Sequence, residues 1–431
     1  MRLNLLPLLL GVLPLPAVAQ GMDPAMPMDH SGMDHSGMEH GPAAHAVHAA
    51  HGQTSASASF SDGSGTARLP GAEPAMTGLH FSPGADWMVM LHGAVSGQYS
   101  AVSGPRGDDK LYATSMAMAM AQKTTDWGRV QLNAMLSLEP AMQARGYPNL
   151  FATGETAGGV PLVDRQHPHD LFMELSARVD VDIAPQTRLF LYGGPVAEPA
   201  LGPSAFMHRS SAALNPEPPI AHHWFDSTHI TYGVVTAGLS AAQWQIEASA
   251  FRGQEPDERR WNIETPRLDS WSVRASWTPT PNWVLQASHG FLKTPEATHA
   301  GANEHRTTAS VHYTKPGFAA MLGFSAKRRD PGDTLRAWLG EASWQLTPRD
   351  TVFGRVENVT NDELFPDHAH PLHDVAFRVT KFQLGYARSI PLGPVLLALG
   401  GAVSAYAKPA VLNADYGTSP IGYTLFARIS L

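Results

Sequence analysis

Sulfur and imidazole donors recur at a fixed spacing near the start of the chain. Residues 28–41 contain Met-Asp-His-Ser-Gly twice and then Met-Glu-His-Gly, so a thioether, a carboxylate and an imidazole return every five residues. Thioethers are soft ligands that favour Cu(I), whereas imidazole binds Cu(I), Cu(II), Zn(II) or Ni(II). With the donors on either side, the candidate metal ligands are Met22, Met26, Met28, His30, Met33, His35, Met38, His40, His45, His48 and His51. This mixture of donors, in a chain without thiolates, predicts the binding of copper or silver ions.

The segment around these repeats is predicted to be a disordered metal-binding tail over residues 20–52, because it has too little apolar bulk to fold alone. Residues i and i+2 of an extended chain point the same way, so one repeat offers a sulfur and a nitrogen to one ion. The alternative is a low-complexity linker in which His and Met are incidental. Methionine is an unusual residue for a linker, so metal binding is favoured. The expected ligand is Cu(I) or Cu(II), without an organic cofactor.

The rest of the chain divides by composition. Residues 1–19 are predicted to be a signal peptide, with Arg2 before an apolar core and the motif Ala17-Val18-Ala19 at the cleavage site. No cysteine follows that site, so no lipid anchor is expected. After the tail, residues 53–85 are rich in Ser, Gly, Ala and Pro and are predicted to be a linker. Residues 86–431 are predicted to be a transmembrane β-barrel.

The bulk composition excludes several classes of function. The chain has no cysteine, so it cannot be a multicopper oxidase or a blue-copper protein, which need a cysteine ligand. A net charge of −8 with 16% charged residues gives no basic patch for nucleic acid. After the leader there is no apolar run long enough for a transmembrane helix. The nucleophile elbow, the metalloprotease motif and the phosphate-binding glycine loop are also missing from the sequence, so no enzyme activity is predicted.

Alternation of apolar and polar residues with a period of two begins after Asp86 and predicts long β-strands. Residues 87–100 place apolar side chains on one face and Met88, Met90 and His92 on the other. Similar alternation occurs at 130–139, 171–183, 243–252, 270–277 and 317–327. One apolar face with aromatic residues near the strand ends is typical of the lipid-facing exterior of a barrel. A soluble β-sandwich also alternates, but its strands are usually shorter.

The connections between strands alternate in length. Short connections are predicted near 123–128, 184–186, 239–242, 278–282, 315–317, 347–349 and 391–393, and long loops at 140–170, 194–227, 253–267 and 358–374. Short periplasmic turns and long extracellular loops are the outer-membrane pattern. The fold class is therefore all-β, an outer-membrane antiparallel β-barrel of about 16 strands (range roughly 12–18) with a disordered Met/His-rich N-terminal tail. Both ends of such a barrel lie in the periplasm, as does the tail.

These features resemble a known family. The Met-Asp-His-Ser-Gly run, behind a signal peptide and ahead of a β-rich remainder, resembles the copper-resistance outer-membrane proteins of the CopB/PcoB type. The resemblance covers about the first tenth of the chain. It implies a role with copper at the outer membrane and leaves transport and sequestration as alternatives.

A second set of donors is predicted inside the barrel. Met88, Met90 and His92 share the polar face of their strand, and Met116, Met118 and Met120 share a face with Lys110 and Gln122 on the next strand. A hairpin turn near Gly104 would set Met88 beside Met120, Met90 beside Met118 and His92 beside Met116. We predict a ladder on the lumenal wall that hands Cu(I) along. The alternative is that these methionines face lipid or fill space.

Histidines in the predicted loops and charges on one strand are further candidates. The densest group is His368, His370 and His373, between Asp367 and Asp374, and it is a predicted metal site. His167, His169, His222, His223, His299 and His305 are also assigned to long loops. At 171–183, Leu171, Met173 and Leu175 fall on the apolar face, and Glu174, Arg178, Asp180 and Asp182 on the other, where we predict structural ion pairs.

The sequence therefore predicts a protein of the bacterial outer membrane that binds Cu(I)/Cu(II) with a periplasmic tail and sequesters it or passes it outward. The expected partners are outer-membrane lipid and a periplasmic copper carrier or oxidase, with no nucleic acid. One alternative is a general porin-like channel whose tail only buffers metal. The other is a soluble periplasmic copper-storage protein.

Overall fold

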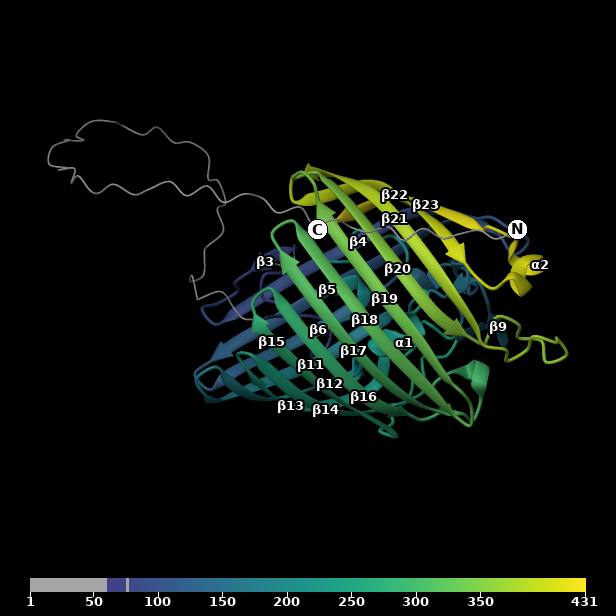
Figure 1. Cartoon of the computed structure of the whole chain (residues 1–431). Helices are drawn as coiled ribbons and strands as arrows, with labels where there is room; N and C mark the ends of the chain where they lie inside the picture. Colours follow the sequence, from purple (N-terminus) through teal and green to yellow (C-terminus); the bar gives the residue numbers. More distant parts are fainter. Residues whose placement is uncertain (1–59, 75–76) are drawn as a thin grey trace, which may run out of the picture. The chain divides into compact units, whose positions relative to one another are not determined.

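The computed structural model describes residues 60–74 and 77–431. Sixteen long antiparallel strands close into one barrel (Figure 1). They are β4 (Trp87–Val102), β5 (Asp109–Thr125), β6 (Gly128–Leu136), β11 (Phe172–Ala184), β12 (Thr187–Ala197), β13 (Thr231–Ala241), β14 (Trp244–Phe251), β15 (Ser270–Thr280), β16 (Trp283–Leu292), β17 (Asn303–Lys315), β18 (Phe318–Asp330), β19 (Thr334–Gln345), β20 (Asp350–Asn361), β21 (Phe377–Leu392), β22 (Val395–Ala407) and β23 (Ile421–Ser430). The predicted all-β barrel of about 16 strands is confirmed.

The barrel closes where the last strand pairs with the first. β23 lies antiparallel to β4 from Gly422 opposite Val102 to Ser430 opposite Ala94. A short strand, β3 (Leu79–Phe81), pairs with Val89–Leu91 near the beginning of β4, just before the residues of β4 that pair with β23. Closure matters because an open sheet edge would leave backbone N–H and C=O groups without partners in a membrane. No helix among the described residues is long and apolar enough to cross a membrane.

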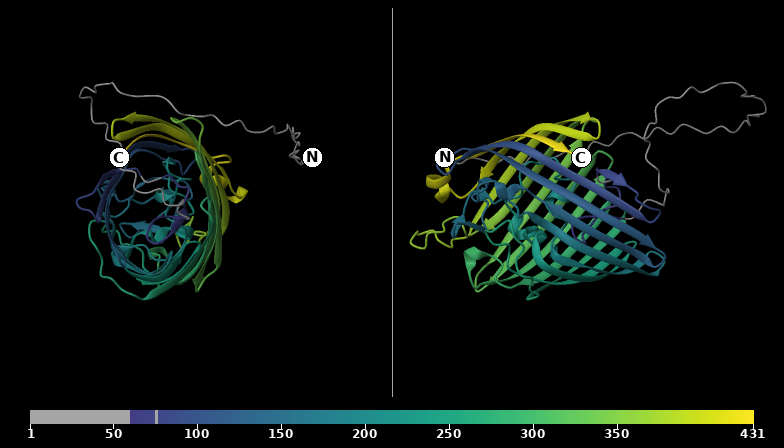
Figure 2. Two further views of the ribbon diagram at one scale, coloured as in Figure 1. Left: turned by 90° about the vertical axis from the view of Figure 1, so that its left-hand side faces the viewer. Right: turned by 180° about the vertical axis from the view of Figure 1, so that it is seen from behind.

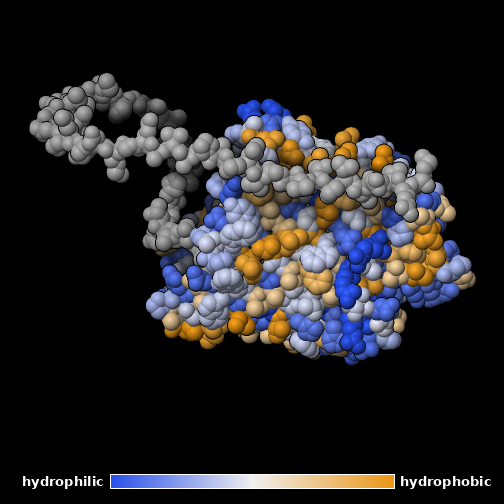
Figure 3. Space-filling view, in the orientation of Figure 1, coloured by the Kyte–Doolittle hydropathy of each residue, from blue (hydrophilic) through white to orange (hydrophobic). Residues whose placement is uncertain are grey.

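The outer wall is apolar because side chains alternate along each strand. In β21, Phe382, Leu384 and Tyr386 are exposed outward, whereas Lys381 and Gln383, which alternate with them, are buried inside. Figure 3 shows apolar side chains spread over the outer face. Aromatic residues lie opposite one another near the short turns, in the pairs Trp244–Trp277, Trp283–Tyr313 and Phe318–Trp344. An apolar belt with an aromatic girdle is the surface that a lipid bilayer requires.

Short turns gather at one end of the barrel and long loops at the other. At the short-turn end only two to four residues join successive strands, as at 126–127, 185–186 and 346–349. At the other end the long loops span 137–171, 198–230, 252–269 and 362–376, although 331–333 is a short exception. β4 begins and β23 ends at the short-turn end, since the number of strands is even.

An N-terminal hairpin lies inside the barrel, as the left view of Figure 2 shows. It consists of β1 (Phe60–Asp62) and β2 (Arg68–Pro70), which belong to the segment predicted to be a linker. Arg68 donates a hydrogen bond to Ser240 Oγ at 2.9 Å, and Asp62 forms an ion pair with Arg129 at 3.1 Å. The hairpin at 60–70 therefore fills part of the lumen and pairs with the wall.

Two long loops also fold into the lumen. Loop 137–171 carries η1 (Glu139–Ala141), β7 (Tyr147–Pro148), β8 (Glu155–Ala157), β9 (Val160–Leu162) and β10 (Arg165–Gln166), and loop 198–230 carries η2 (Phe206–His208), α1 (His222–Phe225) and η3 (Ser227–His229). Leu150 and Phe151 of the first loop pack with Trp224 and Phe225 of α1 against Val359 of the wall. The hydrophobic core of the molecule therefore sits within the barrel. The shorter elements η4 (Ala297–His299), η5 (Ala410–Leu412) and α2 (Asn413–Tyr416) lie in other loops.

Many charges on the inner wall are buried in ion pairs. Arg274 contacts Glu247 at 2.9 Å with neither side chain exposed, and Glu304 pairs with Arg306 in the same way. Arg209 of loop 198–230 reaches Glu341 of the wall at 2.7 Å. Burying an ion without a partner costs several kcal/mol, so such pairs form where the lumen excludes water. A wide aqueous pore would leave these side chains exposed, so the lumen is filled at this level.

One side chain departs from the predicted face. The alternation puts Met173 on the outer face, but it is only 1% exposed and packs with Met135, Val196, Ile230 and Tyr232. The register of β11 against β6 slips between Phe172 and Glu174, where β11 contains one extra residue. A β-bulge of this kind re-aims the side chain at the bulge, so Met173 joins the interior.

We expect Arg209→Met to destabilise the protein by about 3–5 kcal/mol, because it leaves buried carboxylates short of a cation. Arg209 contacts both Asp226 and Glu341, and none of the three side chains is more than 1% exposed. Guanidinium unfolding in detergent, followed by the heat-modifiable shift in gel mobility, measures the change. The matched control is Arg188→Met, which breaks a half-exposed pair with Asp182 and should cost only ~0–1 kcal/mol. Equal losses in the two variants would contradict this account of the lumen.

Candidate functional site

The first candidate is the methionine and histidine face of β4 and β5. These side chains point inward: Met90 is 4% exposed, whereas Leu91 and Leu111 on the opposite face lie outside. The observed register pairs Met90 with Met120 and His92 with Met118, while Met88 lies opposite Gln122 and Met116 opposite Ala94.

The predicted cross-strand partners are therefore wrong, because the observed register of β4 against β5 differs from the predicted register by two residues. The connecting loop occupies 103–108 and is centred beyond Gly104, the residue on which the prediction centred the turn. A shift by two preserves the face, because side chains alternate with a period of two. The lumenal position of the donors is thus as expected, and only their partners change: Met88–Met120, Met90–Met118 and His92–Met116 do not face one another.

The donor row continues onto the next strand. Met118 of β5 lies directly opposite Met135 of β6, so His92, Met118 and Met135 form one transverse row across three adjacent strands. His92 Nδ1 lies 2.6 Å from the carbonyl oxygen of Thr77 and 2.9 Å from that of Leu431. Because a carbonyl only accepts, Nδ1 carries the proton and Nε2 of the neutral ring keeps its lone pair.

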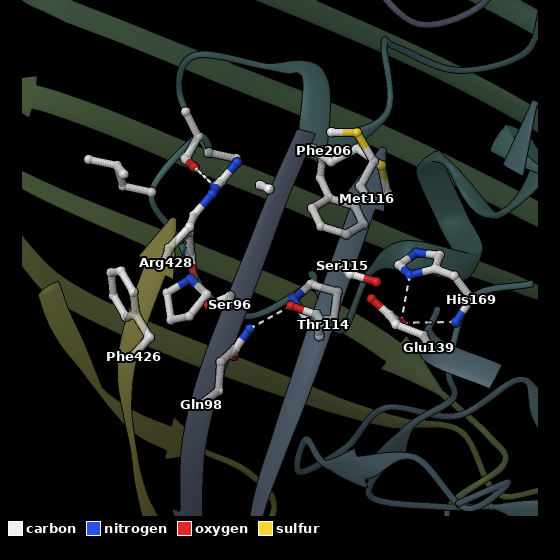
Figure 4. A pocket seen from close by; sticks show the side chains of 18 of the residues that line it. Ser96, Gln98, Thr114, Ser115, Met116, Glu139, His169, Phe206, Phe426 and Arg428 are labelled. Carbon is white, nitrogen blue, oxygen red and sulfur yellow. Dashed lines mark hydrogen bonds and ion pairs between the residues drawn. The ribbon is translucent and has the colours of Figure 1, made fainter. Parts of the chain in front are cut away.

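Five thioethers come together on this side of the lumen. Met116, Met118 and Met207 pack against the buried pair Met135 and Met173. A cavity of about 110 Å³ borders Met116, Met173 and Met207, and its wall also includes His169 and Glu139 (Figure 4). The His169 ring nitrogen Nδ1 lies 2.9 Å from Glu139 Oε2. Thioethers fill irregular space well and also bind soft cations, so the cluster is fitted for packing and for Cu(I) alike.

His169 is one of five imidazoles that form a buried cluster. They belong to the two loops that fold inward, 137–171 and 198–230. Ring centroids lie 5.4 Å apart for His169 and His229, 5.2 Å for His229 and His222, 5.3 Å for His222 and His223, and 6.2 Å for His223 and His167. A chain of donors thus runs from thioethers on the wall to imidazoles in the loops.

Hydrogen bonds orient these rings. His167 Nδ1 donates to the carbonyl oxygen of Pro168 at 3.0 Å, and His229 Nδ1 donates to that of Asp226 at 2.7 Å. His222 Nδ1 contacts the Asp226 carboxylate at 2.9 Å. Fixing one nitrogen of an imidazole by a second residue selects the tautomer and leaves the other nitrogen available.

Burial and charge set the protonation of the cluster. Burial lowers the pKa of His167 and His229 well below the ordinary value, and Arg260 beside His167 adds to the effect. Burial alone would lower the pKa of His223 as well, but Glu255, Glu296 and Glu155 raise it to about 9. Burial raises the pKa of Glu155 to about 7, against the opposing charge of Arg260. Neutral rings of His167 and His229, a protonated ring of His223 and several carboxylates therefore meet in one buried place.

Carboxylates from four loops complete three overlapping groups of donors. The groups are Glu155, His167 and His223; His223, Glu255 and Glu296; and Glu296, His299 and Glu363, and within each group the donor atoms lie within 4.8 Å of one another. His299 is the most accessible member, with 20% of its side chain exposed. Imidazole and carboxylate are ligands of Zn(II) and Cu(II), so these residues could hold such an ion.

The predicted site at His368, His370 and His373 is less complete. The rings of His368 and His373 lie 4.3 Å apart, but His370 stacks on Phe365 instead. His373 Nδ1 donates to the carbonyl oxygen of Phe365 at 2.8 Å. Within 60–74 and 77–431, the groups of three close donors form elsewhere and none includes these histidines.

Other predicted residues fall in different places. His305 lies on β17, opposite Phe291 of β16, so its assignment to a long loop is wrong. Its ring stacks on His289 at 5.9 Å. On the charged face of β11, Asp180 forms ion pairs with Arg178 and Arg129, both at 2.9 Å, in line with the predicted structural ion pairs.

The tail ligands lie outside the described residues: Met22, Met26, Met28, His30, Met33, His35, Met38, His40, His45, His48 and His51.

Several residues of these clusters carry no signal in the sequence. Met135 and Met207 are isolated methionines, and no motif in the sequence distinguishes Glu155, Glu255 or Glu296 from other loop carboxylates. His229 has the one usable signal, because it follows His223 by six residues in the same loop.

The fold is a porin-like antiparallel β-barrel of 16 strands. No protein-family model and no curated protein matches the sequence. Among solved structures, the anion-selective porin from Comamonas acidovorans is 12% identical with a TM-score of 0.52, covering 80% of this chain and 100% of that chain. The OmpF structure from Salmonella typhi, a complex with daunomycin, is 8% identical with a TM-score of 0.51, covering 81% of this chain and 100% of that chain. At these identities the similarity establishes the fold alone.

The register predicts which residues of the methionine face can be cross-linked. We expect Met90→Cys with Met120→Cys to form a disulfide on mild oxidation, because directly opposed side chains have Cβ atoms about 4.5–5.5 Å apart. The chain has no cysteine of its own, so the introduced pair cannot form a disulfide with any other residue of the chain. The control, Met88→Cys with Met120→Cys, is diagonal at roughly 7–8 Å and should cross-link poorly. Non-reducing gel mobility reports the outcome, and faster cross-linking of the control would contradict the register.

Proposed function

We propose that this protein is an outer-membrane barrel that captures copper with its Met/His tail and either holds it or passes it outward along the inner wall. The observation that carries the proposal is the transverse row of His92, Met118 and Met135. This row presents the same two donor types, thioether and imidazole, that alternate in the repeats at 28–41. A cation that exchanges between such donors is soft, as Cu(I) is.

The order of donors along the barrel supports passage in one direction. β4 begins at the short-turn end, which is periplasmic in this class of barrel. From there the inner wall offers Met88, then Met90 with Met120, then the row of His92 and Met118. The cavity beside Met116 and Met173 follows, with His169 in its wall. Soft sulfur donors thus precede the imidazoles and carboxylates of the loops.

The filled lumen favours a specific cargo over free diffusion. The hairpin 60–70 and the loop 198–230 occupy the interior, and wall charges such as Arg274 and Glu247 are wholly buried. A general solute channel requires a continuous aqueous path, to which such burial is unfavourable. The rival function is a porin-like channel, and the shared fold is what supports it.

Copper-dependent growth tests the proposal. In a strain that lacks the gene, the full chain should restore copper tolerance, whereas deletion of residues 22–51 should not. A second variant replaces Met90, Met118, Met120 and Met135 by Leu, which conserves volume and removes sulfur. We expect it to fold, shown by heat-modifiable mobility, and to retain less Cu(I) per purified chain than wild type, because the tail is unchanged and only the ligands of the wall are lost. The matched control is Met142→Leu, a methionine in a loop outside the donor row.

Two results would count against copper handling. One is unchanged copper tolerance and unchanged Cu(I) retention in both the tail deletion and the four-fold Leu variant. The other is rapid flux of unrelated small solutes through the wild-type barrel in liposome swelling, which would assign the porin-like function instead.

A further inference from the structure

We infer that His167, His223 and Glu155, with Glu255 beside them, form a buried binding site for one divalent transition-metal cation of the Zn(II) or Cu(II) kind. The four residues come from loops 137–171, 198–230 and 252–269 and meet inside the barrel. None of them belongs to the Met/His tail or to the methionine row. The site therefore stands apart from the proposed copper capture by the tail.

The contact between His167 and Glu155 calls for a cation. His167 Nδ1 donates its proton to the carbonyl oxygen of Pro168, so Nε2 of the neutral ring carries a lone pair. That nitrogen lies 3.3 Å from Glu155 Oε1, and no residue in the described part of the chain gives it a hydrogen bond. Two acceptors facing each other at this distance repel, unless a proton or a metal ion lies between them.

The dimensions of the site suit a metal ion. His223 Nδ1 lies 3.3 Å from Glu255 Oε1, the same separation as in the pair of His167 and Glu155. Ligands at about 2.0–2.1 Å from a tetrahedral ion are roughly 3.3 Å from one another. A small cavity of about 10 Å³ is lined by these four residues. That is close to the space that one water-sized particle occupies.

Charge at the site favours a dication. Glu155, Asp170, Glu255, Glu296 and Glu363 bring five carboxylates together, whereas Arg260 and Lys327 are the only lysine or arginine side chains of residues 60–74 and 77–431 that form ion pairs with them. The nearby carboxylates Glu304 and Asp362 have arginine partners of their own. A bound dication would offset the excess of negative charge in this buried region.

Surrounding residues hold the ligands in place. Arg260 binds Glu155 Oε2 at 2.9 Å and so leaves Oε1 to face His167. Gly154 packs on the His223 ring, where a Cβ atom would come within 2.6 Å, so this position needs glycine. His229 lines the same cavity, and its buried Nε2 has no hydrogen-bond partner among the described residues. Outer contacts that orient imidazole and carboxylate ligands are typical of metal sites.

The donor set selects the kind of ion. Two imidazoles and carboxylates, without sulfur, suit Zn(II) and Cu(II) and are poor for Cu(I). The lumen would thus offer sulfur sites near the short turns and a nitrogen and oxygen site among the loops.

Metal retention by the full-length protein tests the site. The purified wild-type chain is loaded with Zn(II), washed with a chelator and analysed for metal per chain. We expect His167→Gln and Glu155→Gln each to retain about one ion fewer than wild type, because the tail is the same in all three. His289→Phe, on the outer face of β16, is the matched control and should retain the wild-type number. With Cu(II), electron paramagnetic resonance should show nitrogen coupling from the site, and His167→Gln should reduce it.

Equal retention by wild type and both variants would overturn the site and assign a shared proton to the gap between His167 and Glu155. Glu155→Gln is nearly isosteric, so it decides the question if the histidine variant fails to fold. Loss of tail-dependent copper tolerance with retention of this ion, or the reverse, separates this inference from the proposed function.

Discussion

The structure depends on pairing the charges that its inner wall buries. Arg209 joins loop 198–230 to Glu341, and Arg355 binds the same carboxylate from the wall. Because an unpaired ion in this interior would cost several kcal/mol, loops and wall determine each other's positions. The hairpin at 60–70 obeys the same rule, since Asp62 meets Arg129. A barrel of this width is held together from within as well as by its strands.

Loops and the N-terminal hairpin occupy the lumen of this porin-like fold. The fold is similar to that of an anion-selective porin, and one fold can support unrelated functions. Here the lumen holds a hydrophobic core built from Phe151, Trp224 and Phe225. The chemical properties of the interior therefore depend on the side chains that line its remaining small cavities.

Donor types separate along the barrel. Thioethers such as Met118 and Met135 come from strands near one side of the wall, while His167, His223 and Glu155 come from loops. His169 lies between the two groups, at the cavity beside Met116 and within reach of His229. Soft and harder ligands thus occupy neighbouring places, which suits a cation that changes its coordination as it moves.

The sequence by itself determined the barrel, because alternation with a period of two and alternating loop lengths are local properties. It also determined that Met90, His92 and Met118 face inward, since a shift of two residues keeps the face. Their partners depended on the length of the 103–108 loop, and the side of Met173 depended on a bulge, so only the tertiary structure decided them. The sequence likewise did not show that Glu155, His167 and His223 lie close together, because the path of each loop depends on buried contacts with distant strands.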